Sequence, residues 1–183
     1  MVAYERVITT EQFERFLAQS ENTDRLFELI YGAIVEKMPT REHGIIAGRF
    51  VQKFNNYLDD HPIGNAAVEA RHRPPQDTSN DRLPDVSVVL GDKPIPQEGV
   101  ADYLPDLVVE VQSPRDSWRD MIEKGFFYLD HGTQIVVLVF PGARQIEKLT
   151  RDNRQVLREG DALDLSDLLP GFSTDVKEFF KGV

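Results

Sequence analysis

The sequence predicts an α/β fold with a central mixed β-sheet and helices on both sides. Apolar residues recur about every four positions over residues 43–60, which is typical of a helix with one buried face. Residues 106–111 and 134–140 are almost uninterrupted apolar runs, as in strands that are buried on both faces. A helical pattern over residues 116–130 lies between these runs. This strand–helix–strand order favours a right-handed crossover between parallel neighbours.

The first part of the chain predicts a helix followed by a hairpin. Thr9 or Thr10 can cap the helix, and the apolar residues of its buried face are Phe13, Phe16 and Leu17. Two short strands over residues 26–30 and 33–38 are joined at Tyr31-Gly32, a tight joint typical of a β-hairpin.

The middle of the chain predicts the long helix, two strands and two loops. His61-Pro62 and Gly64 end the helix over residues 43–60. Strands are expected over residues 66–71 and 85–90, with a polar, proline-containing loop between them. Residues 91–103 hold two prolines and two glycines and therefore predict a second, longer loop.

The last part of the chain predicts a helix, three strands and a short final helix. Asp116 or Ser117 caps the helix that ends at His131-Gly132. Pro141-Gly142 is a turn after the strand over residues 134–140, and Asp152-Asn153 is a second turn. The further strands are expected over residues 145–150 and 155–158, and the final helix near residues 174–181.

Length and composition limit the class of protein. A chain of 183 residues with 40% apolar and 28% charged residues predicts one globular domain over residues 1–183. No cysteine is present, which excludes disulfides, a thiolate zinc site and a cysteine nucleophile. No apolar run approaches the roughly 20 residues of a membrane span, and no signal-peptide core is visible at the amino terminus. We therefore expect a cytoplasmic protein with no membrane partner.

The net charge of −10 argues weakly against nonspecific coating of nucleic acid. The acidity is uneven, however: residues 1–36 and 159–183 each have a net charge of −4, whereas residues 144–158 have a net charge of +3. This basic segment is interpreted as a solvated face or a dimer contact. Net charge alone therefore does not exclude a nucleic-acid partner.

Two carboxylates and a lysine suggest metal-assisted chemistry. Asp85 follows Pro84 at the start of a predicted strand, and Glu110 interrupts an apolar strand, where a charge is costly unless it is paired. Carboxylates on neighbouring strands can share a hard divalent cation. Lys124 lies in the next helix, where Asp120 and Tyr128 share its stripe. The simpler alternatives are a buried acid paired with an arginine and a solvated helix lysine paired with Asp120.

These residues resemble a known family. Pro84-Asp85, the segment Asp106-Leu-Val-Val-Glu110-Val-Gln-Ser-Pro114, and Asp120-x-x-x-Lys124-x-x-x-Tyr128 are similar to the Uma family, described as putative restriction endonucleases, of the PD-(D/E)xK nuclease superfamily. The segments Phe27–Gly32, Val35-Glu36, and Glu42-His43-Gly44 agree with this resemblance, which covers residues 10–175.

The resemblance implies a restriction-endonuclease-like core and metal-assisted hydrolysis of DNA phosphodiester bonds. Asp85, Glu110 and the main-chain carbonyl of Val111 would hold Mg²⁺ or Mn²⁺. The superfamily lysine two residues after the second acid is replaced by Gln112, and Lys124 would supply its charge. Glu28 and His43 are further candidate site residues. The simpler alternatives are that Glu28 is an ordinary acid of a strand or hairpin and that His43 is a capping or packing histidine. Many nucleases of this fold cut duplex DNA as dimers, which adds a homodimer to the expectations.

The sequence departs from the family pattern at two positions and leaves three functions open. Ile135 stands where relatives have a glutamate, and Phe140 where they have an aspartate; neither is a predicted metal ligand. One function is a metal-dependent DNA endonuclease. The second is a catalytically inactive module with the nuclease fold, which binds nucleic acid or protein. The third is a metal-dependent hydrolase of a different phosphate ester.

Overall fold

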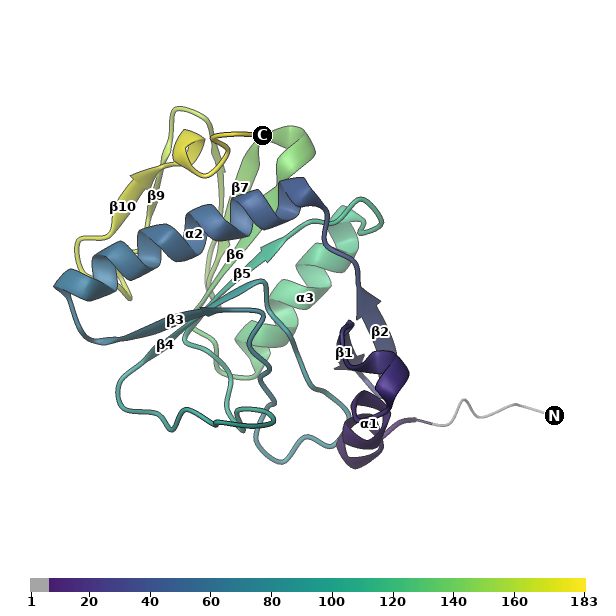
Figure 1. Cartoon of the computed structure of the whole chain (residues 1–183). Coiled ribbons are helices and arrows are strands. Elements are labelled where there is room, and N and C mark those ends of the chain that lie inside the picture. The colour runs from purple at the N-terminus through teal and green to yellow at the C-terminus, as the bar shows by residue number, and fades with distance from the viewer. Residues whose placement is uncertain (1–6) are drawn as a thin grey trace. The chain divides into compact units, whose positions relative to one another are not determined.

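A computed structural model describes residues 7–183 (Figure 1). Its contacts define two compact units. The first unit comprises the chain up to Met38 together with Arg71–Leu83 and Ile95–Tyr103, and the second comprises Pro39–Ala70, Pro84–Pro94 and Leu104–Val183. A compact unit is defined by contacts and not by independent folding, so the expected single domain stays a prediction.

The first unit contains the predicted helix and hairpin. Helix α1 (Thr10–Leu17) begins with a capping box in which Thr9 and Gln12 satisfy each other's main-chain N–H groups. A 3₁₀ turn (η1, Ser20–Asn22) leads to the antiparallel pair β1 (Leu26–Ile30) and β2 (Ala33–Lys37). Tyr31 and Gly32 both have positive φ, 48° and 78°, as a two-residue hairpin turn requires.

A network of ion pairs lies inside the first unit. Asp81 is fully buried and accepts hydrogen bonds from both Arg71 and Arg73, at 2.6 and 2.8 Å. The same two arginines bind Glu14 at 2.7 and 3.0 Å. Burial raises the pKa of Glu14, but the hydrogen bonds and charges of Arg71 and Arg73 outweigh burial and leave that pKa below its usual value.

The second unit is built on a six-stranded sheet whose strands lie in chain order. They are β3 (Gly64–Val68), β4 (Val86–Leu90), β5 (Leu107–Val111), β6 (Ile135–Phe140), β7 (Gln145–Leu149) and β8 (Arg154–Arg158). Only β5 and β6 are parallel, and the other neighbouring pairs are antiparallel. The predicted central mixed sheet is therefore confirmed.

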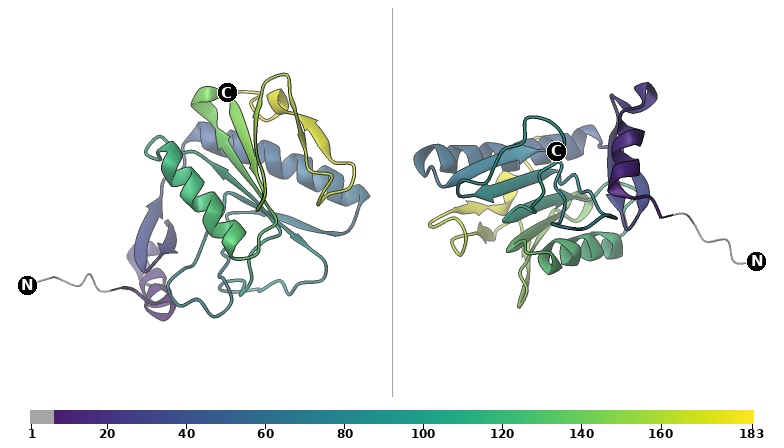
Figure 2. Two further views of the ribbon diagram at one scale, coloured as in Figure 1. Left: turned by 180° about the vertical axis from the view of Figure 1, so that it is seen from behind. Right: turned by 90° about the horizontal axis from the view of Figure 1, so that it is seen from below.

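Helices cover both faces of this sheet (Figure 2). Helix α2 (Arg41–Asp60) buries Ile46, Phe50 and Phe54 against one face, which β5 meets with Val109. Helix α3 (Trp118–Asp130) connects β5 to β6 and packs on the opposite face, which β5 meets with Val108. Because side chains alternate along a strand, a strand between two covered faces is apolar throughout. That alternation explains the apolar runs of β5 and β6.

The pairing of β4 with β5 matters for the site. Val86 lies opposite Val109, and Val88 lies opposite Leu107. The pairing ends at Val86, and Asp85 lies in the bend just before β4. The Asp85 side chain accepts a hydrogen bond from the main-chain N–H of Val111, the residue after Glu110. The sheet thus brings together two positions that are 25 residues apart in the chain.

Two sequence expectations differ from the structure. Instead of a helix near residues 174–181, the tail forms β10 (Ser173–Asp175), paired with β9 (Ala162–Asp164), followed by one 3₁₀ turn (η3, Val176–Glu178). The apolar spacing was right, since Val176, Phe179 and Phe180 are buried, but a single turn suffices to bury them.

Strand β3 is the second difference, because it begins two residues earlier than expected and includes Gly64, which was expected to end the preceding helix. A Cβ on Gly64 would collide with the carbonyl oxygen of Val89 in β4, so glycine allows the two strands to approach. A 3₁₀ turn (η2, Pro141–Ala143) forms the expected turn after β6. Within residues 7–183, no helix has the length and apolar character needed to cross a membrane.

Candidate metal-dependent site

Asp85 is held in place by two donors. It is 2% exposed and lies immediately before β4. Its Oδ2 accepts a hydrogen bond of 2.7 Å from the main-chain N–H of Val111 and lies 2.9 Å from Nε2 of His43. Since a carboxylate only accepts, His43 donates from Nε2. The aspartate is thus fixed to the carboxyl end of β5 and to the first turn of α2.

His43 reaches Asp85 because of how α2 begins. Thr40 caps the helix, and its hydroxyl accepts a hydrogen bond of 3.2 Å from the N–H of His43. This places His43 in the first turn, where its side chain is 5% exposed. Thr40, and not His43, therefore caps α2. The buried position of His43 agrees with the packing alternative, and its role in the site stays a prediction.

Glu110 receives two groups from α3. Its Oε1 accepts a hydrogen bond of 3.0 Å from the hydroxyl of Tyr128, and its Oε2 lies 3.4 Å from Nζ of Lys124. Lys124 and Tyr128 are four residues apart, so they project from the same face of the helix toward the sheet. The carboxylate is 1% exposed, and its charge is compensated within the fold.

Asp120, the third member of the predicted stripe, has a different role. It forms a capping box with Ser117, whose hydroxyl donates to Asp120 Oδ2 at 2.7 Å. This hydrogen bond, and a second from the Ser117 N–H, hold the pKa of Asp120 below its usual value. Lys124 accordingly forms its ion pair with Glu110.

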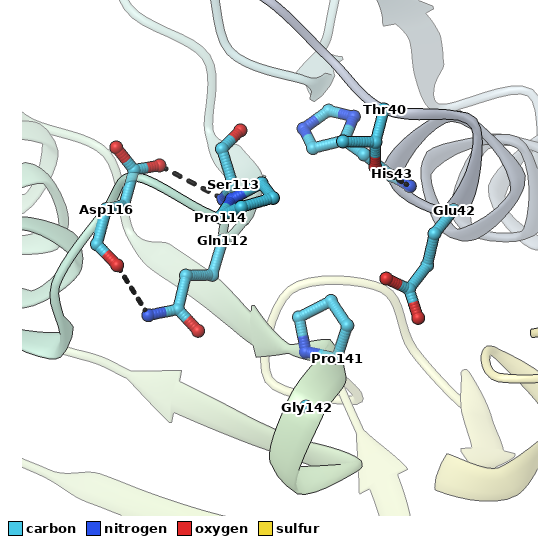
Figure 3. A pocket seen from close by; sticks show the side chains of 9 residues that line it. All are labelled: Thr40, Glu42, His43, Gln112, Ser113, Pro114, Asp116, Pro141 and Gly142. Atoms are coloured by element: carbon cyan, nitrogen blue, oxygen red, sulfur yellow. Dashed lines mark hydrogen bonds between the residues drawn. The ribbon is translucent and has the colours of Figure 1, made fainter.

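A polar pocket of about 260 Å³ lies in the second unit (Figure 3), and neither Asp85 nor Glu110 is among its lining residues. Two predicted site residues, His43 and Gln112, line it. The other lining residues come from the start of α2, from the loop between β5 and α3, and from the turn after β6: Thr40, Glu42, Ser113, Pro114, Asp116, Pro141 and Gly142. The amide of Gln112 donates to the main-chain oxygen of Asp116 at 2.9 Å and so faces the pocket as a fixed polar group.

Glu28 belongs to the first unit. Its carboxylate is 1% exposed and accepts a hydrogen bond of 3.0 Å from the N–H of Leu83. This contact fixes β1 to the segment that precedes Pro84. A role for Glu28 in the metal site stays a prediction.

The donor set fits a hard divalent cation. Asp85, Glu110 and the carbonyl of Val111 offer oxygen, which Mg²⁺ and Mn²⁺ prefer, and Mg²⁺ commonly keeps several waters besides one or two carboxylates. Among the described residues, no group of three or more His, Cys, Asp or Glu side chains is arranged to hold a metal. The expected set contains only two carboxylates, and water would complete the coordination.

Sequence reasoning missed two contacts of this site. Tyr128 was placed on the same helix stripe as Lys124, but its hydrogen bond to Glu110 was not anticipated. The N–H of Val111 was not anticipated as a ligand of Asp85, because it depends on the register between strands. The described geometry defines a class: an α/β fold with a six-stranded mixed sheet, a helix on each face and two buried carboxylates, one just before β4 and one in β5.

The comparisons with known proteins identify the family. Residues 10–177 match the family model Uma2, described as "Putative restriction endonuclease", and the chain belongs to this family. A solved structure from Anabaena variabilis, described as a putative nuclease belonging to DUF820, is similar with a TM-score of 0.79 and 24% identity, covering 94% of this chain and 97% of that chain. No curated protein matches. The resemblance and the nuclease-like fold expected from the sequence are confirmed.

Proposed function

We propose that the protein is an endonuclease that hydrolyses DNA phosphodiester bonds with Mg²⁺ or Mn²⁺. The observation that carries the proposal is that two buried carboxylates lie at neighbouring strands: Asp85 is bonded to the main-chain N–H of Val111, the residue next to Glu110. Lys124 lies within 3.4 Å of one of them. Membership of a family described as restriction endonucleases supports the same reaction class.

Each residue has a role in this proposal. Asp85, Glu110 and the Val111 carbonyl would hold the ion, which would activate water and polarise the phosphate. The Val111 N–H and His43 orient the carboxylate of Asp85. Lys124 places a positive charge next to Glu110, where it can stabilise negative charge developing on the transferring phosphate. The hydroxyl of Tyr128 fixes the orientation of the Glu110 carboxylate.

The alternative function is a module with the same fold that binds nucleic acid or protein without catalysis. Gln112 in place of the superfamily lysine and the net charge of −10 favour it. It predicts neither metal binding at Asp85 nor cleavage. The two functions therefore differ in two measurements that do not depend on each other.

Cleavage and metal binding test the proposal together. Supercoiled plasmid and single-stranded DNA are incubated with wild type, Asp85→Ala and Glu110→Ala in Mg²⁺ and in Mn²⁺, and Mn²⁺ binding is measured by calorimetry. Asp167→Asn is the matched control, because its carboxylate is 81% exposed and pairs with Lys148. Cleavage and stoichiometric Mn²⁺ binding in wild type and control, absent in both alanine variants, support the nuclease. Equal results in all four proteins would refute it.

The homodimer and the cytoplasmic location also stay predictions. Sedimentation velocity measures the first, and fractionation of the source cells measures the second.

A further inference from the structure

A half-exposed tryptophan lies at the start of α3, close in the chain to a residue that lines the pocket. Trp118 follows Asp116, a pocket residue, by two positions, and 46% of its surface is exposed. An aromatic side chain that stays half exposed gives up part of the free energy that its burial would contribute to folding. Such exposure is therefore a reason to look for a binding role. Nothing in the proposed metal chemistry uses this side chain.

The fold holds Trp118 in one orientation. Its indole Nε1 donates to Oε1 of Glu147 at 3.1 Å, and the guanidinium of Arg154 lies over one face of the ring, 4.8 Å from the ring centroid. Arg154 is itself fixed, because it donates to both oxygens of Glu147 at 2.8 and 2.9 Å. One carboxylate therefore positions an aromatic ring and a planar cation together.

Glu147 explains why this arrangement is unlike an ordinary surface pair. Its side chain is fully buried, and Gln145 adds a further hydrogen bond of 3.0 Å. A buried ion pair often stabilises a fold no more than apolar residues of the same size would. Here the buried acid orients two side chains that stay about half exposed, Trp118 at 46% and Arg154 at 44%.

The surface extends along the edge of the sheet. Leu149 packs on α3 and lies opposite Arg154 in the β7–β8 register, so Arg154 is on the α3 face of the sheet. Every second residue of a strand points to the same face, so Val156 and Arg158 are on that face as well. Val156 and Arg158 are exposed. We call Trp118, Arg154, Val156 and Arg158 the tryptophan strip. Arg154, Val156 and Arg158 lie in the segment of residues 144–158, which has a net charge of +3 within a chain of net charge −10.

The chemistry of the strip fits unpaired bases. An exposed aromatic face beside arginines is how proteins bind single strands without sequence preference: bases stack on the ring and cations contact the phosphates. In a duplex the base faces are covered by neighbouring pairs and cannot stack on a side chain. We propose that the tryptophan strip binds single-stranded nucleic acid and leads it to the pocket, so that the substrate class of the site is nucleic acid with unpaired bases.

This inference rests on the proposed function, because it names the substrate of that site. A second copy of the chain is a less suitable occupant. β8 is an edge strand of the sheet, but antiparallel pairing of two β8 strands about Val156 would set Arg154 opposite Arg158. Like charges directly opposite each other destabilise such a pair.

The chain contains a direct reporter for the test, since Trp118 is its only tryptophan. The wild-type protein is titrated with a 15-mer of deoxythymidylate in EDTA at low salt, and tryptophan emission is recorded. Stacking of a base on the indole is expected to quench the tryptophan emission, and the quenching should reach a plateau as the oligonucleotide saturates the protein. A blunt duplex of equal length is expected to cause a much smaller change at the same phosphate concentration.

Variants are measured by the anisotropy of a labelled oligonucleotide, which needs no tryptophan. Trp118→Ala is expected to raise Kd about 5- to 150-fold, the equivalent of one base stack, and Trp118→Phe should recover part of this loss. Arg154→Lys keeps a cation next to Glu147 and removes the planar guanidinium, so it tests the strip without uncovering a buried charge. Lys177→Ala is the matched control: this half-exposed cation pairs with Asp175 at 3.1 Å. Its neighbour Val176 packs into the α2-side core.

Each outcome decides the inference. We expect a Kd in the micromolar range. The absence of quenching at an oligonucleotide concentration 100-fold above that range would overturn the inference, and so would equal quenching by the duplex. Emission that changes with protein concentration alone would assign the strip to self-association instead. Because EDTA prevents metal-dependent cleavage, the nuclease proposal is tested separately. Quenching without cleavage would remove the nuclease and leave the strip as a binding surface with no substrate role, and cleavage without quenching would remove only this inference.

Discussion

The contact between Lys124 and Glu110 gives the sharpest quantitative prediction. Replacing Lys124 with methionine keeps a long, helix-favouring side chain and removes only the charge. Replacing Glu110 with glutamine keeps its shape and an acceptor for Tyr128. The two single variants and the double variant form a thermodynamic cycle, which isolates the coupling between the two groups.

The magnitude follows from the geometry. Unit charges separated by the observed 3.4 Å interact by about 5 kcal/mol at an effective dielectric constant of 20. Two features reduce this value: the Lys124 side chain is 20% exposed, and 3.4 Å is longer than an optimal charge-assisted hydrogen bond. We therefore expect a coupling energy of about 1–3 kcal/mol. Lys124→Met alone should lower Tm by roughly 4–8 °C, because it leaves a buried carboxylate without that partner.

The assay is urea unfolding in EDTA at pH 7.5 and low salt, monitored by circular dichroism. All four proteins should show similar m values, so that the differences report stability and not a change of the unfolded state. A coupling energy below about 0.5 kcal/mol would refute the reasoning, because it would mean that Lys124 points into solvent and does not contact Glu110.

Three further predictions concern the scaffold. Ser117→Ala removes the cap of α3 and should lower the free energy of unfolding by about 1 kcal/mol in urea titrations, with Ser117→Asn close to wild type. Arg71 and Arg73 lower the pKa of Glu14, so ionised Glu14 stabilises the folded state above its unfolded pKa, and this stabilisation is lost as pH falls below about 4. The Tm difference between wild type and Glu14→Gln should therefore shrink from pH 7 to pH 3. A Tm difference that stays constant over this range would contradict the prediction. Gly125→Ala should be destabilising in thermal scans, because its Cβ would lie 2.7 Å from a methyl of Leu149, whereas Gly48→Ala meets no atom within 4 Å and should stabilise α2 by up to about 1 kcal/mol.

Much of the fold could be predicted because its elements are long or strongly patterned. The four-residue apolar spacing of α2 and the unbroken apolar runs of β5 and β6 reflect burial directly, and the structure confirms them. The tail was harder to predict because its apolar spacing suits both a helix and a single 3₁₀ turn. What decides between them is the pairing of β10 with β9, a tertiary contact that local sequence does not encode.

The candidate site was predictable in its residue types and not in its contacts. Asp85 and Glu110 are conspicuous because carboxylates are unexpected in or next to buried strands. Their partners depend on packing: the Val111 N–H reaches Asp85 through the β4–β5 register, and Tyr128 reaches Glu110 through the placement of α3. The role proposed for Trp118 depends in the same way on Glu147, which is 29 residues away in the chain.

The β4–β5 register also affects when the proposed activity can appear. A slip of one residue would turn the side chains of one strand to the opposite face and separate the two carboxylates. The site therefore exists only in the correctly folded sheet, and a growing chain on the ribosome that has not yet paired these strands has no nuclease activity. Folding itself would then protect the cell's DNA from the unfinished chain. Cleavage and strand pairing should be lost at the same temperature on heating.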